Sequence, residues 1–339
     1  MSVPTIKDVA KLAGVSISTV SRVMNESKPV SPESRRKVLD AIKKLDFKPN
    51  ELARSLVMRK SNMIGVIVKD IGISYMAQII RGIEEIGRMY NYDILLSSTY
   101  GDIEVEHKII EFMCTKQVEG IIMISEKINP EILFKLKSKN IPFVRLDKFY
   151  EYTDEHTVSI DYKSTCNKMT NYLVDEGQES IIFISEDITS RIGREKLAGF
   201  NEAVAERKVK SALINSKDIT VQAGYDMGEE IFKLIKDNKS TVVFASEDSL
   251  AIGFISYCYD NGLKVPQDIS VAGFGDDIIA SIYRPALTTI EEPYYDMGAI
   301  SMRKLIKELR NEEKLKDVTI LPSRIVERGS VATFKKKNK

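Results

Sequence analysis

Residues 5–25 read TIKDVAKLAGVSISTVSRVMN, and this stretch decides how the chain begins to fold. Thr5 and Asp8 have the spacing of a capping box, which marks the start of a helix. Val9, Leu12 and Ala13 then follow at helical spacing and form a narrow apolar stripe. The sequence therefore predicts a short helix whose apolar face is buried.

A tight turn and a second helix come next. Gly14 lies where the chain must turn, and Ser16 can cap the helix that follows. Val20, Val23 and Met24 point inward, which leaves four residues on the outer face: Ile17, Ser18, Ser21 and Arg22. Short polar side chains with one arginine on a protruding helix suit the major groove of DNA. The pattern predicts a DNA-binding helix-turn-helix; the alternative is two amphipathic helices of an ordinary bundle.

A third helix completes a small head that ends near Phe47. Ser31 caps this helix, Pro32 takes its first position, and its predicted buried stripe consists of Val38, Leu39, Ile42 and Leu45. Residues 49–60 then predict a short helix capped by Asn50, too short to be stable alone. The alternative for this segment is a plain linker.

The charge is distributed unevenly. Residues 1–60 carry 13 Lys and Arg against 6 Asp and Glu, and the rest of the chain carries 37 against 43, although the net charge is only +1. A basic head on a larger acidic body indicates that nucleic acid is the partner of the head alone.

From residue 64 the pattern changes to apolar strands that alternate with amphipathic helices. Near-continuous apolar strands of this kind predict parallel sheets covered on both faces, an α/β fold. The predicted strands cover residues 64–68, 93–96, 120–124, 142–146, 158–160, 180–184, 241–245 and 269–272, and predicted helices include 76–90, 164–176, 197–206 and 250–261.

Some 270 residues of this pattern exceed one core, so we expect two doubly wound subdomains with a cleft between them. The predicted organisation is a head (1–48), a hinge segment (49–61), a core (62–330) and a basic tail (331–339). Within the core, one subdomain covers about 62–160 and 291–320, and the other about 161–290 and 321–330. Ligands bind outside the carboxyl ends of strands in such folds, where the loops begin at Asp70, Asp147, Glu186, Glu247 and Gly275.

The cysteines and the termini indicate a cytoplasmic protein. Cys114, Cys166 and Cys258 are odd in number, widely spaced and set among apolar residues, so we expect reduced core cysteines rather than disulfides or a zinc site. The chain leads directly into a charged helix without a signal peptide, and no apolar run approaches the ~18 residues of a membrane span.

Ordered motifs along nearly the whole chain resemble the LacI/GalR family of bacterial transcription regulators. They are residues 5–10 (TIKDVA), 14–16 (GVS), 19–25 (TVSRVMN), 49–50 (PN), 53–56 (ARSL), 271–274 (VAGF), 285–290 (PALTTI) and 296–298 (DMG). The resemblance implies a core like that of periplasmic binding proteins. It also implies a homodimer whose two heads bind a pseudo-palindromic operator, acting mainly as a repressor.

Specific contacts to the operator follow from this resemblance. We expect positioning contacts to phosphates from Thr5, Ser16, Thr19, Ser21, Asn25, Ser31 and Asn50. Ile17, Ser18 and Arg22 should contact bases. Ala53, Arg54 and Leu56 should occupy the minor groove, where Leu56 would wedge into a base step of DNA as residues 50–56 fold on it. The alternative for Leu56 is packing of a linker.

Residues 82–94, 116–122, 159–162 and 294–299 are similar to a branch of the family that controls carbohydrate and carbon-catabolite genes. That likeness implies control by the phosphocarrier protein of the sugar phosphotransferase system, phosphorylated on a serine. The residues that match its docking surface are Tyr295, Asp296, Arg303, Lys307 and Arg324. Arg303 and Lys307 are four apart and share a helix face, and basic pairs bind phosphoserine; the alternative is ordinary solvated charges.

The cleft departs from the pattern of sugar-binding relatives. Lys196 replaces an arginine of the family, Gly275 an aspartate and Ile73 an asparagine. Loss of such polar partners costs ~1–3 kcal/mol each, so tight binding of a free sugar is disfavoured, while Lys196 suits a phosphate or is simply a solvated residue at a helix start. The candidate effector residues are Asp70, Tyr75, Lys196, Asp248 and Asp276.

Other function classes fit the sequence less well. His107 and His156 are the only histidines, and the motifs of nucleophilic, phosphate-binding and zinc enzymes are missing, so we expect neither an enzyme nor a cofactor. A periplasmic sugar-binding protein would need a secretion signal in place of the basic head. A LacI-type repressor released by a sugar or sugar phosphate remains the alternative within the family.

Overall fold

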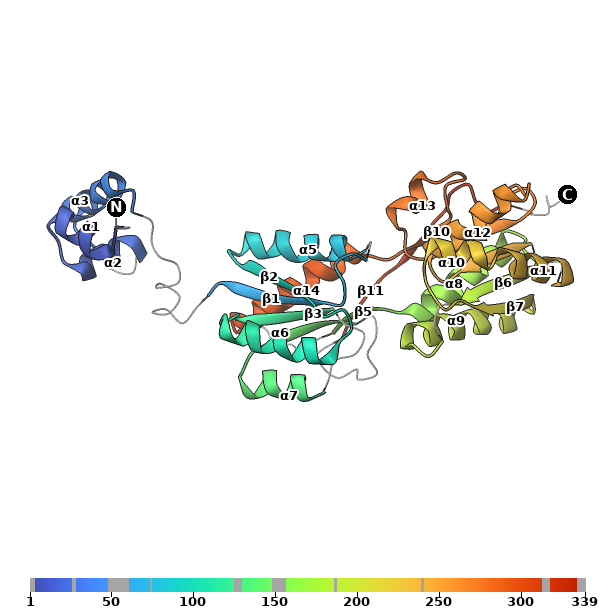
Figure 1. Ribbon diagram of the computed structural model, residues 1–339, viewed down its shortest axis with the longest axis horizontal. Helices are drawn as coiled ribbons and strands as arrows, with labels where there is room; N and C mark the ends of the chain where they lie inside the picture. Colours follow the sequence, from blue (N-terminus) through green and yellow to red (C-terminus); the bar gives the residue numbers. More distant parts are fainter. Residues whose placement is uncertain are drawn as a thin grey trace. The chain divides into compact units, whose positions relative to one another are not determined.

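The computed structural model describes residues 4–25, 29–47, 61–73, 75–124, 130–147, 157–185, 188–238, 241–312 and 318–333. It divides into two compact units, residues 1–61 and residues 62–339 (Figure 1). Residues 49–60 of the hinge segment, with Asn50, Ala53, Arg54 and Leu56, lie outside the described residues.

The head consists of α1 (Ile6–Ala13), α2 (Ile17–Asn25) and α3 (Pro32–Leu45). Its core is built around Val9, Val20 and Val38, each fully buried. The predicted stripes are wrong at two positions, since Leu12 is 50% and Leu39 51% exposed. In a head of three short helices, each helix buries only a narrow strip of its surface. The apolar residue at the edge of that strip therefore remains half exposed, as Leu12 does on α1 and Leu39 on α3.

The first sheet of the second unit has six parallel strands in the order β11-β5-β4-β3-β1-β2. Their bounds are β1 (Met63–Val68), β2 (Asp93–Ser98), β3 (Gly120–Ile124), β4 (Phe143–Asp147), β5 (Thr157–Ile160) and β11 (Thr319–Leu321). Strand residues alternate between the two faces. Val66 and Val68 therefore belong to the same apolar cluster as residues of α5 (Met76–Met89) and α14 (Tyr294–Leu309), whereas Ile67 clusters with residues of α6 (Ile103–Thr115) and α7 (Pro130–Ser138).

The second sheet has four parallel strands in the order β7-β6-β8-β9. The strands are β6 (Ser180–Ser185), β7 (Lys210–Asn215), β8 (Val242–Ala245) and β9 (Ser270–Ala272). Phe183 and Phe244 face α8 (Tyr162–Asp175) and α9 (Arg191–Arg207), and their neighbours Ile184 and Val243 face the opposite layer. That layer comprises α10 (Val221–Asp226), α11 (Gly228–Asn238) and α12 (Asp248–Asp260).

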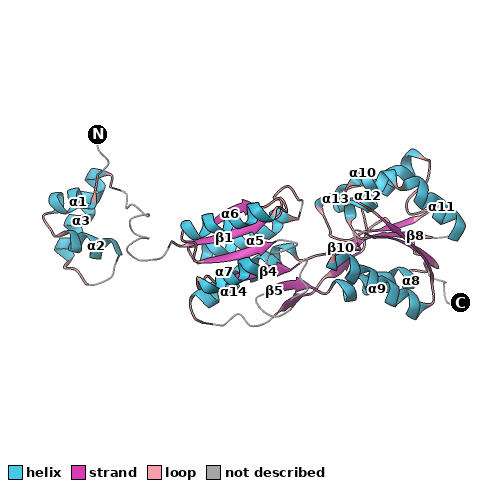
Figure 2. Ribbon diagram, turned by 60° about the horizontal axis from the view of Figure 1, so that its bottom comes forward, coloured by secondary structure: helices cyan, strands magenta, loops and turns pink. Residues whose placement is uncertain are grey.

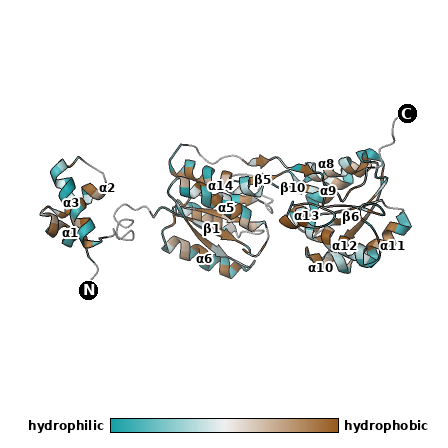
Figure 3. Cartoon of the chain, turned by 90° about the horizontal axis from the view of Figure 1, so that it is seen from above, coloured by the Kyte–Doolittle hydropathy of each residue, from teal (hydrophilic) through white to brown (hydrophobic). Residues whose placement is uncertain are grey.

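Both sheets are thus covered by helices on both faces (Figure 2). In Figure 3 hydrophobic colour appears on strands such as β1 and β6, which lie between the helices, as well as on parts of the helices, as expected for buried parallel strands. The α/β class and the doubly wound parallel sheets predicted from the sequence are confirmed. The chain leaves the first sheet after β5, returns through β10 (Thr289–Glu291) into α14, and leaves again after β11 into β12 (Arg324–Val326), which pairs with β10.

Element ends differ from the prediction by a few residues. The helix predicted at 197–206 begins at Arg191, and the one predicted at 164–176 begins at Tyr162. Cys166 and Cys258 are buried free thiols as expected, while Cys114 is only half-buried. Among the described helices, none is long and apolar enough to cross a membrane.

Candidate nucleic-acid interface and effector cleft

The start of α2 carries a cluster of hydroxyl groups. The main-chain N–H of Thr19 donates to Oγ of Ser16 at 3.1 Å, which confirms the predicted helix cap. The Ser16 hydroxyl also lies 2.8 Å from the hydroxyls of Ser18 and Thr19. The helix dipole and the N–H groups of the first turn favour an anion at this end.

The outer face of α2 has the predicted composition. Ile17 is 46% exposed, and Ser18 and Arg22 are exposed as well, whereas Ser21 is half-buried. The inner face is formed by Val20 and Val23, which are buried. Helix α2 therefore presents two polar side chains and one apolar side chain to solvent on one face. The side chain of Asn25, at the end of α2, lies outside the described residues.

The other two helices of the head begin with polar groups of the same kind. Both the N–H and the hydroxyl of Thr5 donate to the Asp8 carboxylate, at 2.8 and 2.7 Å. The hydrogen bond from the Thr5 hydroxyl is the largest of the causes that lower the pKa of Asp8. Oγ of Ser31 accepts from the N–H of Ser34 at 3.2 Å. Thr5 and Ser31 thus lie at helix N-termini, as the sequence predicts for phosphate contacts.

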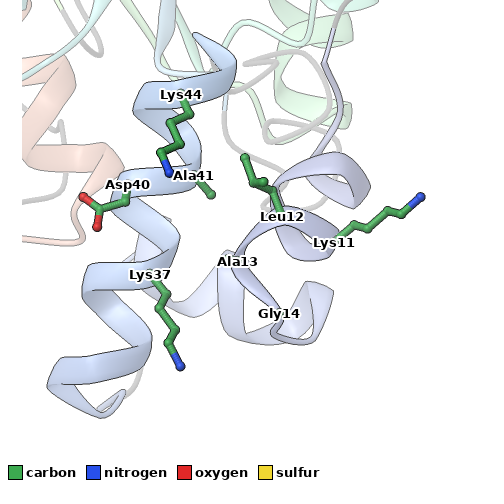
Figure 4. Close-up of a pocket in the computed structure, with 8 residues that line it drawn as sticks. All are labelled: Lys11, Leu12, Ala13, Gly14, Lys37, Asp40, Ala41 and Lys44. Atoms are coloured by element: carbon green, nitrogen blue, oxygen red, sulfur yellow. The ribbon is translucent and has the colours of Figure 1, made fainter.

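A groove separates the end of α1 from α3 (Figure 4). The partly exposed Leu12 points toward α3 there, and Ala41 forms part of the opposite wall. Lys37, whose ammonium pairs with Glu33 at 2.8 Å, and Lys44 line the same groove. None of the residues of α2 whose side chains are described lines it, so this basic groove is separate from the exposed face of α2.

In the second unit, the predicted effector residue Lys196 is buried, with 1% of its surface exposed. Its ammonium group donates to the carbonyl of Ser246 at 2.8 Å and to the carboxylate of Glu247 at 3.1 Å. It also lies 4.2 Å from the ring centre of Phe274 and 5.8 Å from that of Tyr162. The alternative of a solvated residue at a helix start is therefore wrong, since Lys196 lies inside α9 and its charge is paired.

Asp248 is buried beside this cluster, also with 1% of its surface exposed. Its carboxyl accepts from the hydroxyl of Thr289 at 2.5 Å and from the N–H of Asp277 at 2.9 Å. Burial raises the pKa of Asp248 to about 7, against the lowering effect of these two bonds. Its oxygens thus fix the loop after β9 and the strand β10, and are not free donors or acceptors for a ligand.

The remaining effector candidates have other partners. Asp276 pairs with Arg328 at 2.6 Å, and Asp70 accepts from the N–H of Gly72 in its own loop at 2.8 Å. Tyr75 stacks on Tyr294, with ring centres 4.8 Å apart. Burial is the largest cause that raises the pKa of Tyr294, and the charge of Glu247 adds to it.

The chain therefore brings Lys196, Asp248 and Tyr294 to one region, where strands of the second sheet end. The sequence analysis did not predict four residues of this region: Tyr162, Phe274, Thr289 and Tyr294. Their positions just after strands β5 and β9 and in or shortly after β10 were the available signal.

The predicted docking residues lie on α14 and β12. Arg303 and Lys307 are both exposed on α14, as their spacing predicts, and Asp296 is exposed in the first turn. The Tyr295 hydroxyl donates to Glu85 of α5 at 2.7 Å. Arg324 is exposed on β12 and pairs with Glu291 of β10.

Sequence comparisons agree with this arrangement. Residues 5–50 match the family described as bacterial regulatory proteins of the lacI family, and residues 170–331 match a periplasmic binding protein-like domain. Catabolite control protein A of Priestia megaterium is 35% identical over 329 residues, which cover 96% of this chain and 98% of that protein. The chain belongs to the LacI family.

Solved structures of this family have the same fold. The Lac repressor dimer bound to operator and the anti-inducer ONPF matches with a TM-score of 0.87 at 24% identity, covering 98% of this chain and all of that one. The regulator CcpA of Lactococcus lactis matches with a TM-score of 0.68 at 28% identity, covering 79% of this chain and 98% of that one. This LacI-family chain is accordingly a DNA-binding transcription regulator, and the relatives confirm the prediction that it is not an enzyme.

Proposed function

We propose that the chain binds a pseudo-palindromic operator as a homodimer and mainly represses carbohydrate and carbon-catabolite genes. The observation that carries the DNA-binding part is the exposed face of α2, with Ser18 and Arg22 beside the hydroxyl cluster of Ser16. In this proposal Ile17, Ser18 and Arg22 contact bases, and Ala53, Arg54 and Leu56 occupy the minor groove.

We further propose that a serine-phosphorylated phosphocarrier protein docks on α14 and tightens DNA binding. Arg303 and Lys307 support this, because both are exposed on one helix and can donate charge-assisted hydrogen bonds to a phosphate. Tyr295 lies on the same helix, α14, as Arg303 and Lys307. Arg324 is already paired with Glu291. On docking it would either pair with the phosphate in place of Glu291 or remain at the edge of the docking surface.

Allostery requires two distinct sites and a two-state element that both can bias. The DNA-binding face lies in the head and the docking surface in the second unit.

The second candidate function, a repressor released by a sugar or sugar phosphate in the cleft, is favoured by the position of Lys196 at the carboxyl ends of strands. It is weakened because Lys196 and Asp248 are already occupied by partners from the chain itself.

The test is fluorescence anisotropy on a labelled palindromic operator of the family type. The full-length protein is titrated alone, with the serine-phosphorylated phosphocarrier protein, and with a panel of sugars and sugar phosphates. Tightening by the phosphoprotein alone is the expected result. Release by one sugar with the phosphoprotein inert would establish the second candidate instead.

A further inference from the structure

The ammonium group of Lys196 is held on several sides. It donates to one carbonyl oxygen, that of Ser246, and to one carboxylate, that of Glu247, at 2.8 and 3.1 Å. The ring of Phe274 lies 4.2 Å away, within the range of a cation–π interaction, and Tyr162 lies at 5.8 Å. Aromatic faces combined with an acidic group are the chemistry that recognises ammonium ions.

These groups come from segments that meet at the carboxyl ends of parallel strands. Ser246 directly follows β8, Phe274 follows β9, and Tyr162 begins α8 after β5. Strands β8 and β9 belong to the second sheet and β5 to the first, and ligands of doubly wound sheets bind outside such carboxyl ends. Lys196 reaches this place from inside α9 and is 1% exposed, so a side chain of the protein fills the place where a ligand would contact these strand ends.

We propose that this edge of the cleft is an ammonium-binding cage whose occupant is the chain's own Lys196, and that it is therefore closed to sugars. A sugar hydroxyl would have to displace a charged group from Glu247, the Ser246 carbonyl and Phe274. A neutral hydroxyl cannot replace the ion pair and the cation–π contact that would be lost. A sugar phosphate meets a cation that is already paired, and its negative charge is opposed by Glu247.

The neighbouring charges support a cation rather than an anion. Asp248 is buried next to Glu247; burial is the main cause that raises its pKa to about 7, and the charges of Glu247 and Asp277 add smaller contributions. An additional anion at this position would add to that repulsion, whereas an ammonium group relieves it.

Chemical rescue of Lys196→Ala tests the cage. The deleted atoms correspond to propylammonium, so this ion should enter the cage and restore its contacts. We expect the thermal unfolding midpoint of the full-length variant to fall by on the order of 5 °C or more. Propylammonium should restore most of that loss in a saturable manner, and 1-propanol or sodium chloride at equal ionic strength should not.

Lys236→Ala is the matched control. Lys236 lies 4.4 Å from the ring centre of Phe232 on α11, but it is solvent-exposed. Its removal should hardly change the midpoint, and propylammonium should have no more effect than sodium chloride. If Lys196→Ala accumulates unfolded, it should refold in propylammonium and not in 1-propanol.

The response of the wild-type protein to sugars is an independent test of the proposal. Glucose and glucose 6-phosphate should leave its unfolding midpoint unchanged. Saturable stabilisation by either compound, or a response of Lys196→Ala to propylammonium no larger than to sodium chloride, would overturn the proposal. Because these measurements contain neither DNA nor phosphoprotein, their failure is distinguishable from failure of the proposed function.

Discussion

Thr289 donates its hydroxyl hydrogen to the buried carboxyl of Asp248 across 2.5 Å. This bond joins strand β10 to the start of α12, and Asp277 adds a second bond from the loop after β9. Three segments are thereby fixed to a single carboxyl group. The protonation state of Asp248 is consequently coupled to the stability of this part of the fold.

Asp248 should make the stability of the protein depend on pH. Its pKa is about 7 in the folded chain against 3.8 as the ordinary value, so the folded state retains a proton that the unfolded state has released. Below about pH 4 the retained proton contributes on the order of 2–4 kcal/mol to the free energy of unfolding, and this contribution is lost as the pH rises through 7. Urea unfolding of wild type and Asp248→Asn at several pH values in this window measures it.

Glu106 provides the comparison for that experiment. Burial raises the pKa of Glu106 on α6 to about 7 as well. Glu106→Gln should therefore remove another part of the dependence of the unfolding free energy on pH. Each single variant should therefore retain part of the pH dependence, and the double variant should retain least. A slope in Asp248→Asn equal to that of the wild type would contradict the role given to Asp248.

Helices α5 and α14 pack so closely that Gly298 has no room for a side chain. A Cβ atom there would lie 2.0 Å from the carbonyl oxygen of Ile79. Gly298→Ala should separate the helices and destabilise the fold by about 1–3 kcal/mol, measured by urea unfolding. Gly329→Ala is the control, since its Cβ would meet only ordinary contacts at 3.7 Å or more; equal effects of the two substitutions would refute the packing argument.

Ser16 caps α2, and its removal should loosen the recognition helix. Ser16→Ala deletes the acceptor for the Thr19 N–H, which costs about 0.5–2 kcal/mol. We expect faster hydrogen exchange of the amides of α2 in the full-length protein, with unchanged exchange in the sheets of the second unit. Unaltered exchange in α2 would show that the cap contributes nothing.

Arg22 should determine the preferred base at one operator position. Arg22→Ala is expected to weaken operator binding by ~1–3 kcal/mol and to relax the preference at that position, because a bidentate contact to guanine would be lost. Selection from a randomised operator library measures this preference. Lys44→Ala, in the groove between α1 and α3, should alter affinity only uniformly across sequences. A preserved base preference in Arg22→Ala would remove Arg22 from the set of base-reading residues.

Local signals in the sequence predicted the three helices of the head and eight strands of the sheets, but not β7, β10, β11 and β12. The caps at Ser16 and Ser31 depend on residues three positions away, and strand patterning depends on nearest neighbours. The state of Lys196 could not be predicted in this way, because its burial depends on Glu247, 51 residues further along. The same holds for Asp248, whose partner Thr289 is 41 residues distant.

The exposed residues of the head illustrate a second limit. Leu12 and Leu39 have helical spacing that predicts burial, yet both are about half exposed. Periodicity identifies the apolar face of a helix but not how much of that face its neighbours cover. In a head of three short helices, that coverage is decided by packing geometry.

The most direct test of the proposed regulation is the operator affinity of three proteins, each measured with and without the serine-phosphorylated phosphocarrier protein. They are the wild type, the double variant Arg303→Ala/Lys307→Ala, and the control Lys233→Ala, an exposed lysine on α11. We expect the phosphoprotein to tighten operator binding of the wild type and the control at least tenfold, about 1.4 kcal/mol of coupling. The double variant should lose this response while keeping its basal affinity. An equal response in the double variant, or no response in the wild type, would contradict the proposed regulation.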